Sequence, residues 1–149
     1  MKFRDALLIV VAVLLVDQLS KFLFRNLLAE NSISILGGFF RFALTYNTGA
    51  AFSIFTGYNF LLIILSVLII AILFYYLKIY SNEKFGYESF GLSLIIGGAL
   101  GNLVDRIYLG SVVDFIDIWI WPVFNLADAA ITIGVIIIIY KILVKESSV

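Results

Sequence analysis

Two aspartates lie in strongly apolar segments of this sequence and are suited to carry chemistry. Asp114 interrupts the run Val112–Ile116, and Asp128 lies in the first turn of the apolar stretch Phe124–Val144. An ionisable side chain at membrane depth costs a few kcal/mol, so its presence there points to a function. Neither aspartate has a basic residue within one helical turn, so neither is half of a local ion pair.

The residue types that the chain lacks narrow this chemistry. The 149 residues include no histidine and no cysteine, which excludes Ser-His-Asp and Cys-His catalysis and the usual zinc ligand sets. We therefore expect catalysis by carboxylates, with no metal and no cofactor. Two carboxylates that meet can share a proton, so that one activates a water molecule and the other hydrogen-bonds or protonates a carbonyl oxygen.

The composition indicates an integral membrane protein. Hydrophobic residues make up 63% of the chain and charged residues 13%, and the mean hydropathy is +1.13. A soluble domain has about 25% charged residues. Ten basic and ten acidic residues cancel, so no net field favours nucleic acid as a partner.

Four segments are long and apolar enough to span a bilayer, which needs about 20 residues. We expect one all-α membrane domain over residues 1–149, with spans at about 6–24, 58–77, 90–107 and 123–144. Pro122 is a start signal for the last span. The outer loops are then residues 25–57 and 108–122.

The basic residues beside the spans predict the orientation. The side that includes both termini holds six: Lys2, Arg4, Lys78, Lys84, Lys141 and Lys145. The other side holds four: Lys21, Arg25, Arg41 and Arg106. This difference favours cytoplasmic termini, and both aspartates then lie near the outer face.

The first outer loop has the pattern of a strand. Phe39–Tyr46 is aromatic and β-branched and follows the turn residues Gly37 and Gly38. Non-helical backbone near a membrane is buried in protein or lines a wet cavity. We expect a small β-like cradle on the bilayer in this loop, with the turn Asn47–Ser53 dipping towards the helices.

Other polar residues near the span ends allow two interpretations each. Asp17 and Lys21 share a helix face and form either a structural ion pair or a support for the active carboxylates. Asn102, Asp105 and Arg106 crowd the outer end of the third span. Arg106 could cap that helix and pair with Asp105, or these residues could serve the active site.

Asp117 and Asn125 lie close in sequence to the two aspartates. Asp117 precedes the aromatic segment Ile118–Pro122, which is typical of a membrane interface, and we place it outside the active pair. Asn125 is three residues before Asp128 on the same predicted helix face, where it can hydrogen-bond a carboxyl group.

At this point the chain closely resembles the bacterial lipoprotein signal peptidases (signal peptidase II). Five motifs match in family order: Asp17–Lys21, Asn47–Ser53, Gly97–Arg106, Gly110–Ile116 and Phe124–Ala129. Each motif alone is weak, but five in order on four spans are specific.

The resemblance implies an aspartic endopeptidase of the bacterial inner membrane whose catalytic pair is Asp114 and Asp128. Its substrates would be prolipoproteins in the membrane lipid, cleaved just before their diacylglyceryl-modified cysteine. Globomycin would be an inhibitor. The resemblance further implies that Asn47, Gly49, Asn102, Arg106 and Asn125 line the substrate cleft. It leaves Asp17, Lys21 and Asp105 as structural support.

Two other classes compete with this interpretation. A small proton-coupled transporter or channel could use Asp114 and Asp128 as a relay, but such sites usually lie near the midplane on broken, repeated helices. A purely structural assembly factor would not need two unpaired carboxylates. The sequence favours the peptidase and leaves the oligomeric state open.

Overall fold

Four long helices and a four-stranded sheet make up the fold. The computed structural model describes residues 2–49, 55–81 and 86–146. In chain order the elements are α1 (Phe3–Leu27), β1 (Ile33–Ile35), the 3-10 turn η1 (Leu36–Gly38), β2 (Phe40–Asn47), α2 (Asn59–Tyr80), α3 (Tyr87–Leu109), β3 (Val112–Ile118), β4 (Trp121–Phe124) and α4 (Leu126–Glu146).

The helices have the length and composition of membrane spans, and within the described residues four qualify. A bilayer offers no partner to backbone N–H and C=O groups, so an apolar span folds as a helix that satisfies them internally. Apolar side chains are exposed along α2 and α4, for example Leu68, Ile72 and Ile136. Exposed apolar surface of this extent is suited to contact with lipid chains.

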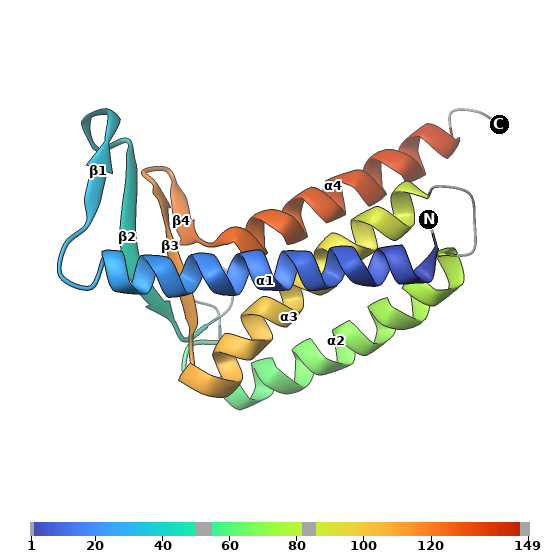
Figure 1. Ribbon diagram of the computed structural model, residues 1–149, viewed down its shortest axis with the longest axis horizontal. Helices are drawn as coiled ribbons and strands as arrows, with labels where there is room; N and C mark the ends of the chain where they lie inside the picture. Colours follow the sequence, from blue (N-terminus) through green and yellow to red (C-terminus); the bar gives the residue numbers. More distant parts are fainter. Residues whose placement is uncertain (1, 50–54, 82–85, 147–149) are drawn as a thin grey trace.

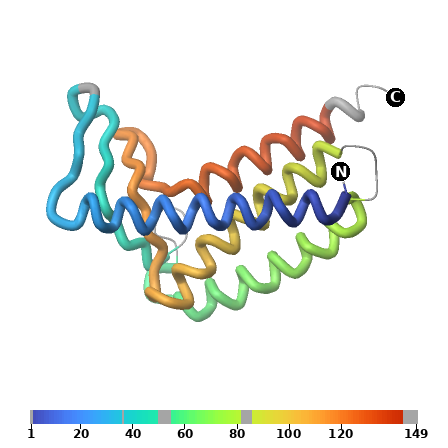
Figure 2. Tube along the Cα trace, in the orientation of Figure 1, coloured from blue at the N-terminus to red at the C-terminus, as the bar shows by residue number. Residues whose placement is uncertain are grey.

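The central helix of the bundle is α3. It contacts each of the other three helices, with α1 crossing it and α2 and α4 on either side (Figures 1 and 2). Its buried side chains Leu92, Ile96 and Leu103 join a core cluster that includes Val10 of α1 and Leu77 of α2.

Glycines bring α3 and α4 into backbone contact. A Cβ atom added at Gly91 would lie 2.9 Å from the carbonyl oxygen of Gly134, and one added at Gly134 would lie 2.6 Å from that of Gly91. Small residues let helices in a membrane approach this closely. The close approach continues to Gly98, which faces the carbonyl group of Ala127, and it places the start of α4 beside α3.

The sheet caps one end of the bundle, and the two termini lie at the other end (Figure 1). Its strand order is β1-β2-β3-β4, with every neighbouring pair antiparallel. Phe24 near the end of α1 stacks on Phe115 of β3 and Phe42 of β2, with ring centroids 4.2 and 4.8 Å apart. These aromatic contacts fasten the sheet to the helices.

The structure confirms the four helices and the small sheet, with two differences in the second outer loop. The sheet is not confined to the first loop, because β3 and β4 come from the second. The fourth helix begins at Leu126, not at residue 123. Pro122 lies in the edge strand β4, where a missing N–H is tolerated.

Candidate active site

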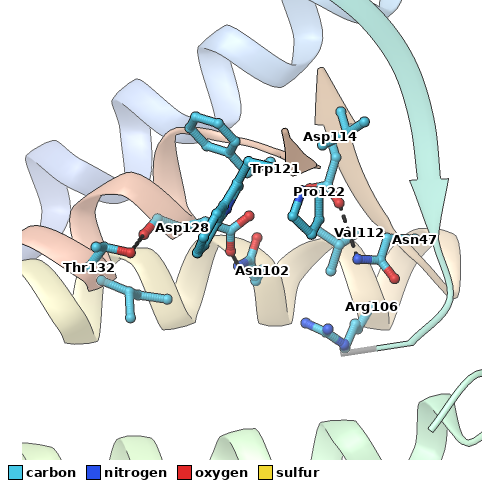
Figure 3. Close-up of a pocket in the computed structure, with 12 residues that line it drawn as sticks. Asn47, Asn102, Arg106, Val112, Asp114, Trp121, Pro122, Asp128 and Thr132 are labelled. Carbon is cyan, nitrogen blue, oxygen red and sulfur yellow. Dashed lines mark hydrogen bonds between the residues drawn. The ribbon is translucent and has the colours of Figure 1, made fainter. Parts of the chain in front are cut away.

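Asp114 and Asp128 meet in one cleft at the sheet end of the bundle. Asp114 is on β3 and only 2% exposed, and Asp128 is the third residue of α4. Both line a cavity of about 330 Å³ together with Asn47, Asn102 and Arg106 (Figure 3). The two carboxylates are fourteen positions apart in sequence. They lie in one cleft because β3, which carries Asp114, and the start of α4, which carries Asp128, both line it.

The buried side chain of Asn125 joins the two aspartates. Its Nδ2 donates to Asp114 Oδ1 over 2.7 Å, and its Oδ1 accepts the backbone N–H of Asp128 over 2.9 Å. In return, Asp128 Oδ2 accepts the backbone N–H of Asn125 over 3.2 Å. This is a capping box at the start of α4. Asn125 therefore precedes the helix and caps it, instead of sharing a helix face with Asp128 as predicted.

Asn102 holds the other oxygen of Asp128. Its Nδ2 donates to Asp128 Oδ1 over 2.8 Å, while its Oδ1 accepts from Lys21 Nζ over 3.0 Å. A lysine ammonium has only donors, so Lys21 fixes which end of the Asn102 amide faces Asp128.

A buried ion-pair network surrounds Lys21. Its Nζ lies 2.8 Å from Asp17 Oδ2 and 3.0 Å from Asp105 Oδ2, and all three side chains are at most 4% exposed. Each carboxylate also accepts one backbone N–H. Asp105 accepts that of Val113, next to Asp114, and Asp17 accepts that of Ala127, next to Asp128. The network thus fixes the backbone beside both aspartates.

The rim of the cleft is held by Asn47, Gly49 and Arg106. Asn47 Nδ2 donates to Asp114 Oδ2 over 3.2 Å, and its Oδ1 accepts the N–H of Gly49 over 3.0 Å. Arg106 Nη2 donates to the carbonyl oxygen of Gly49 over 3.0 Å. A bulge in β2, between Phe42 and Thr45, lies opposite Asp114, and such bulges often re-aim a side chain next to an active site.

The pKa of Asp114 is raised from 3.8 to about 7. Burial is the main cause, and the negative charge of Asp128 adds to it, while the hydrogen bonds from Asn47 and Asn125 act in the opposite direction. A carboxyl group that keeps its proton near neutral pH can serve as an acid. The described residues contain no group of three or more His, Cys, Asp or Glu that could hold a metal ion.

Comparisons with known proteins identify the family. The family model described as signal peptidase (SPase) II matches residues 9–144. The chain belongs to this family. A lipoprotein signal peptidase from Halothermothrix orenii is 41% identical over 140 residues, which are 93% of this chain and 95% of that protein. One from Pseudomonas syringae pv. tomato is 39% identical over 138 residues, 86% of this chain and 79% of that one.

Solved structures agree with the sequence relatives. A bacterial membrane enzyme determined by the in meso method at 2.3 Å resolution has a TM-score of 0.85 and 33% identity, covering 97% of this chain and 90% of that one. A second such enzyme, at 1.9 Å, has a TM-score of 0.78 and 34% identity over 93% and 92% of the two chains. The protein is thus an aspartic-type signal peptidase II of a bacterial membrane, with several spans, and the transporter alternative has no support.

The structure brings the predicted site residues together in two layers. Five line or bound the cleft around the two aspartates: Asn47, Gly49, Asn102, Arg106 and Asn125. Asp17, Lys21 and Asp105 lie behind them. Of the two interpretations for Arg106, pairing with Asp105 is not the one observed, because Asp105 pairs with Lys21.

Asp117 lies apart from the cleft. It pairs with Arg41, the residue opposite it in the register of β2 and β3, and Arg41 Nε lies 2.8 Å from Asp117 Oδ2. Side chains alternate between the two faces of a strand. Asp117 is three residues from Asp114 on β3, so the two side chains lie on opposite faces of the sheet.

Two residues near the site were missed in the sequence. Gln18 Nε2 donates to the carbonyl oxygen of Gly101 and to Asp105 Oδ1, each over 3.1 Å. Asn59 Nδ2 donates to the carbonyl oxygen of Arg106 over 3.0 Å. Asn59 is a polar residue at the start of an uncharged span. A polar side chain at that position could have indicated that it contacts the site.

Proposed function

We propose that Asp114 and Asp128 are the catalytic pair with which this signal peptidase II removes signal peptides from prolipoproteins. The cleaved bond is the one before the diacylglyceryl-modified cysteine. The observation that carries the proposal is that one buried asparagine, Asn125, binds both carboxylates in a single cleft. Family membership supports the substrate class.

The two aspartates have different environments and take different roles. The raised pKa of Asp114 makes it the acid that hydrogen-bonds the scissile carbonyl oxygen. Asp128 lies at the N-terminus of α4, which favours a negative charge, so it acts as the base. A water molecule attacks the carbonyl carbon and gives a proton to Asp128. Asp128 then passes this proton to the amine leaving group as the C–N bond breaks.

The remaining predicted residues divide between substrate binding and support. Asn47, Gly49 and Arg106 at the rim would contact the peptide, whereas Asn102 and Asn125 would bind it while holding the aspartates. Asp17, Lys21 and Asp105 would keep the backbone of β3 and α4 in place.

The membrane places the substrate in this cleft. We propose that both termini are cytoplasmic and that the cleft is near the outer face of the bacterial inner membrane. The acyl chains of the substrate would lie in lipid and hold the scissile bond at the depth of the two aspartates. Removal of the acyl chains would therefore weaken binding of the substrate and misplace the scissile bond. A cyclic peptide such as globomycin would inhibit by occupying the same cleft.

Substitution of either aspartate tests the catalytic pair. We expect Asp114→Asn and Asp128→Asn each to reduce cleavage of a diacylglyceryl-modified peptide by about 10³-fold or more, because paired catalytic groups act as a unit. The measurement is the rate of product formation by purified protein in detergent micelles. Asp117→Asn, on the same strand as Asp114, is the matched control and should keep substantial activity. Full activity of Asp114→Asn would overturn the assignment.

Cleavage of peptides with and without the lipid, and treatment with inhibitors, test the lipid requirement and the mechanism. The same peptide with an unmodified cysteine should be cut far more slowly than its diacylglyceryl form. Strong chelators and serine- or thiol-directed reagents should not inactivate the enzyme, since activated water is the nucleophile. Equal rates on the two peptides would contradict the role given to the lipid.

A further inference from the structure

Asp114 lines two cavities, of which the first is the cleft that it shares with Asp128. The second has a volume of about 300 Å³. Both cavities are lined by Asn47, Asp114, Pro122 and Val123. A peptide bond held at Asp114 therefore has room for chain on both sides of it.

The linings of the two cavities differ in origin. The first includes side chains from the membrane helices α3 and α4, among them Ile131 and Thr132. Among the described residues, the second is lined by strands β2, β3 and β4 and by two residues between β2 and α2, and by no helix. Its other described lining residues carry a hydroxyl group: Thr45, Tyr46, Thr48 and Thr56.

The substrate has the same asymmetry about its scissile bond. Its signal peptide is an apolar segment that stays in the bilayer, as does the acyl part of the lipidated cysteine. The mature polypeptide is polar and must leave the membrane helices on the watery side. The cavity beside α4 suits the apolar part, and the hydroxyl-lined cavity beside the sheet suits the polar part.

We infer that the cavity lined by Thr45, Tyr46, Thr48 and Thr56 binds the first residues of the mature lipoprotein, those that follow the lipidated cysteine. This inference rests on the proposed function. Thr45, Tyr46 and Thr48 are exposed, so their hydroxyl groups can donate to and accept from a peptide in extended conformation. Among the described residues, Asp114 is the one charged side chain that lines this cavity, so the cavity suits short polar residues of the substrate.

A charge placed in the cavity tests the assignment. Thr48→Lys and Thr48→Glu are compared on two lipidated peptides that carry Glu or Lys at the second residue after the cysteine. The measured quantity is the ratio of kcat/KM for the Glu peptide to that for the Lys peptide. We expect Thr48→Lys to raise this ratio, and Thr48→Glu to lower it, by up to about fivefold, the upper range for an exposed ion pair. Both values of the ratio are measured on the same preparation of a variant, so a partial loss of folded protein does not affect the ratio.

A control variant and a control peptide pair locate the effect. Ser34→Lys adds the same charge on the exposed strand β1 outside both cavities and should leave the ratio at the wild-type value. Unchanged ratios in both Thr48 variants would overturn the inference. So would a change confined to peptides that carry the charge on the signal-peptide side of the bond. Failure of the wild-type protein to cut any lipidated peptide would refute the proposed function instead.

Discussion

Asn125 shows how one side chain can serve both the fold and the chemistry. As the residue before α4, it caps the helix, because its Oδ1 accepts the backbone N–H of Asp128. The same amide donates to Asp114. A helix cap contributes about 1 kcal/mol to stability, so the orientation of Asp114 and Asp128 is coupled to the formation of the helix.

The raised pKa of Asp114 predicts the pH dependence of cleavage. Below a pH of about 7 Asp114 keeps its proton and can act as the acid. Above that pH it ionises, and kcat/KM should fall by about tenfold per unit of pH. The measurement is a pH profile of kcat/KM on the lipidated peptide. The control variant Asp117→Asn should have the same pH profile as the wild-type protein. A rate that stays constant from neutral to strongly alkaline pH would contradict Asp114 as the acid.

At the scale of elements, one buried cation holds four of them in register. Lys21 on α1 pairs with Asp17 on the same helix and with Asp105 on α3. These carboxylates bind the backbone of α4 at Ala127 and of β3 at Val113. Removing one partner of a buried ion pair leaves an uncompensated charge, which costs about 3–5 kcal/mol.

Lys21→Met should therefore lower the thermal unfolding temperature strongly and also reduce cleavage, since Asn102 Oδ1 loses the charged one of its two donors, Lys21 and Asn125. Addition of Asp17→Asn should recover part of the stability, because the amide oxygen still accepts from Ala127 while one buried negative charge is removed. Arg41→Met breaks the more exposed ion pair with Asp117 and should cost less than about 1 kcal/mol. Equal losses in Lys21→Met and Arg41→Met would show that the buried network is not the stronger tie.

At the scale of the whole molecule, the distribution of elements along the bundle axis defines two different ends. The sheet lies at one end, and the start of α1 and the end of α4 lie at the other (Figures 1 and 2). The cleft and the buried ion pairs of Lys21 are on the side of the sheet, since residues of β3 line the cleft and bind Asp105. An even number of spans puts both termini on one side of a membrane. We propose that the cleft faces the opposite side, outside the cytoplasm, because the basic residues beside the spans favour cytoplasmic termini.

Labelling of single cysteines tests this orientation in a chain without native cysteine. Ser34→Cys on the exposed strand β1 should react with a membrane-impermeant maleimide added to intact cells or spheroplasts. Arg4→Cys, on an exposed side chain near the N-terminus, should react only after the membrane is opened. Labelling of Arg4→Cys in sealed cells, together with protection of Ser34→Cys, would reverse the topology and the proposed side of the cleft.

The sequence by itself determined the features that depend on local composition. The four spans follow from the length of apolar runs, and β2 (Phe40–Asn47) follows from the aromatic and β-branched pattern at Phe39–Tyr46. Asp114 and Asp128 stood out because a charge in an apolar segment is costly without a function. Five motifs in order were enough for the family.

Only the tertiary structure decided the relations between distant residues. The sequence could not place β3 and β4 beside β2, because sheet partners are chosen by long-range packing and not by local pattern. It could not show that Lys21 orients Asn102 across 81 positions, or that Asp105 pairs with Lys21 instead of its neighbour Arg106. Close contacts of Gly97 and Gly101 of α3 with α1, at Val13 and Asp17, bring these side chains together. Such contacts depend on how whole helices cross, which no local pattern specifies.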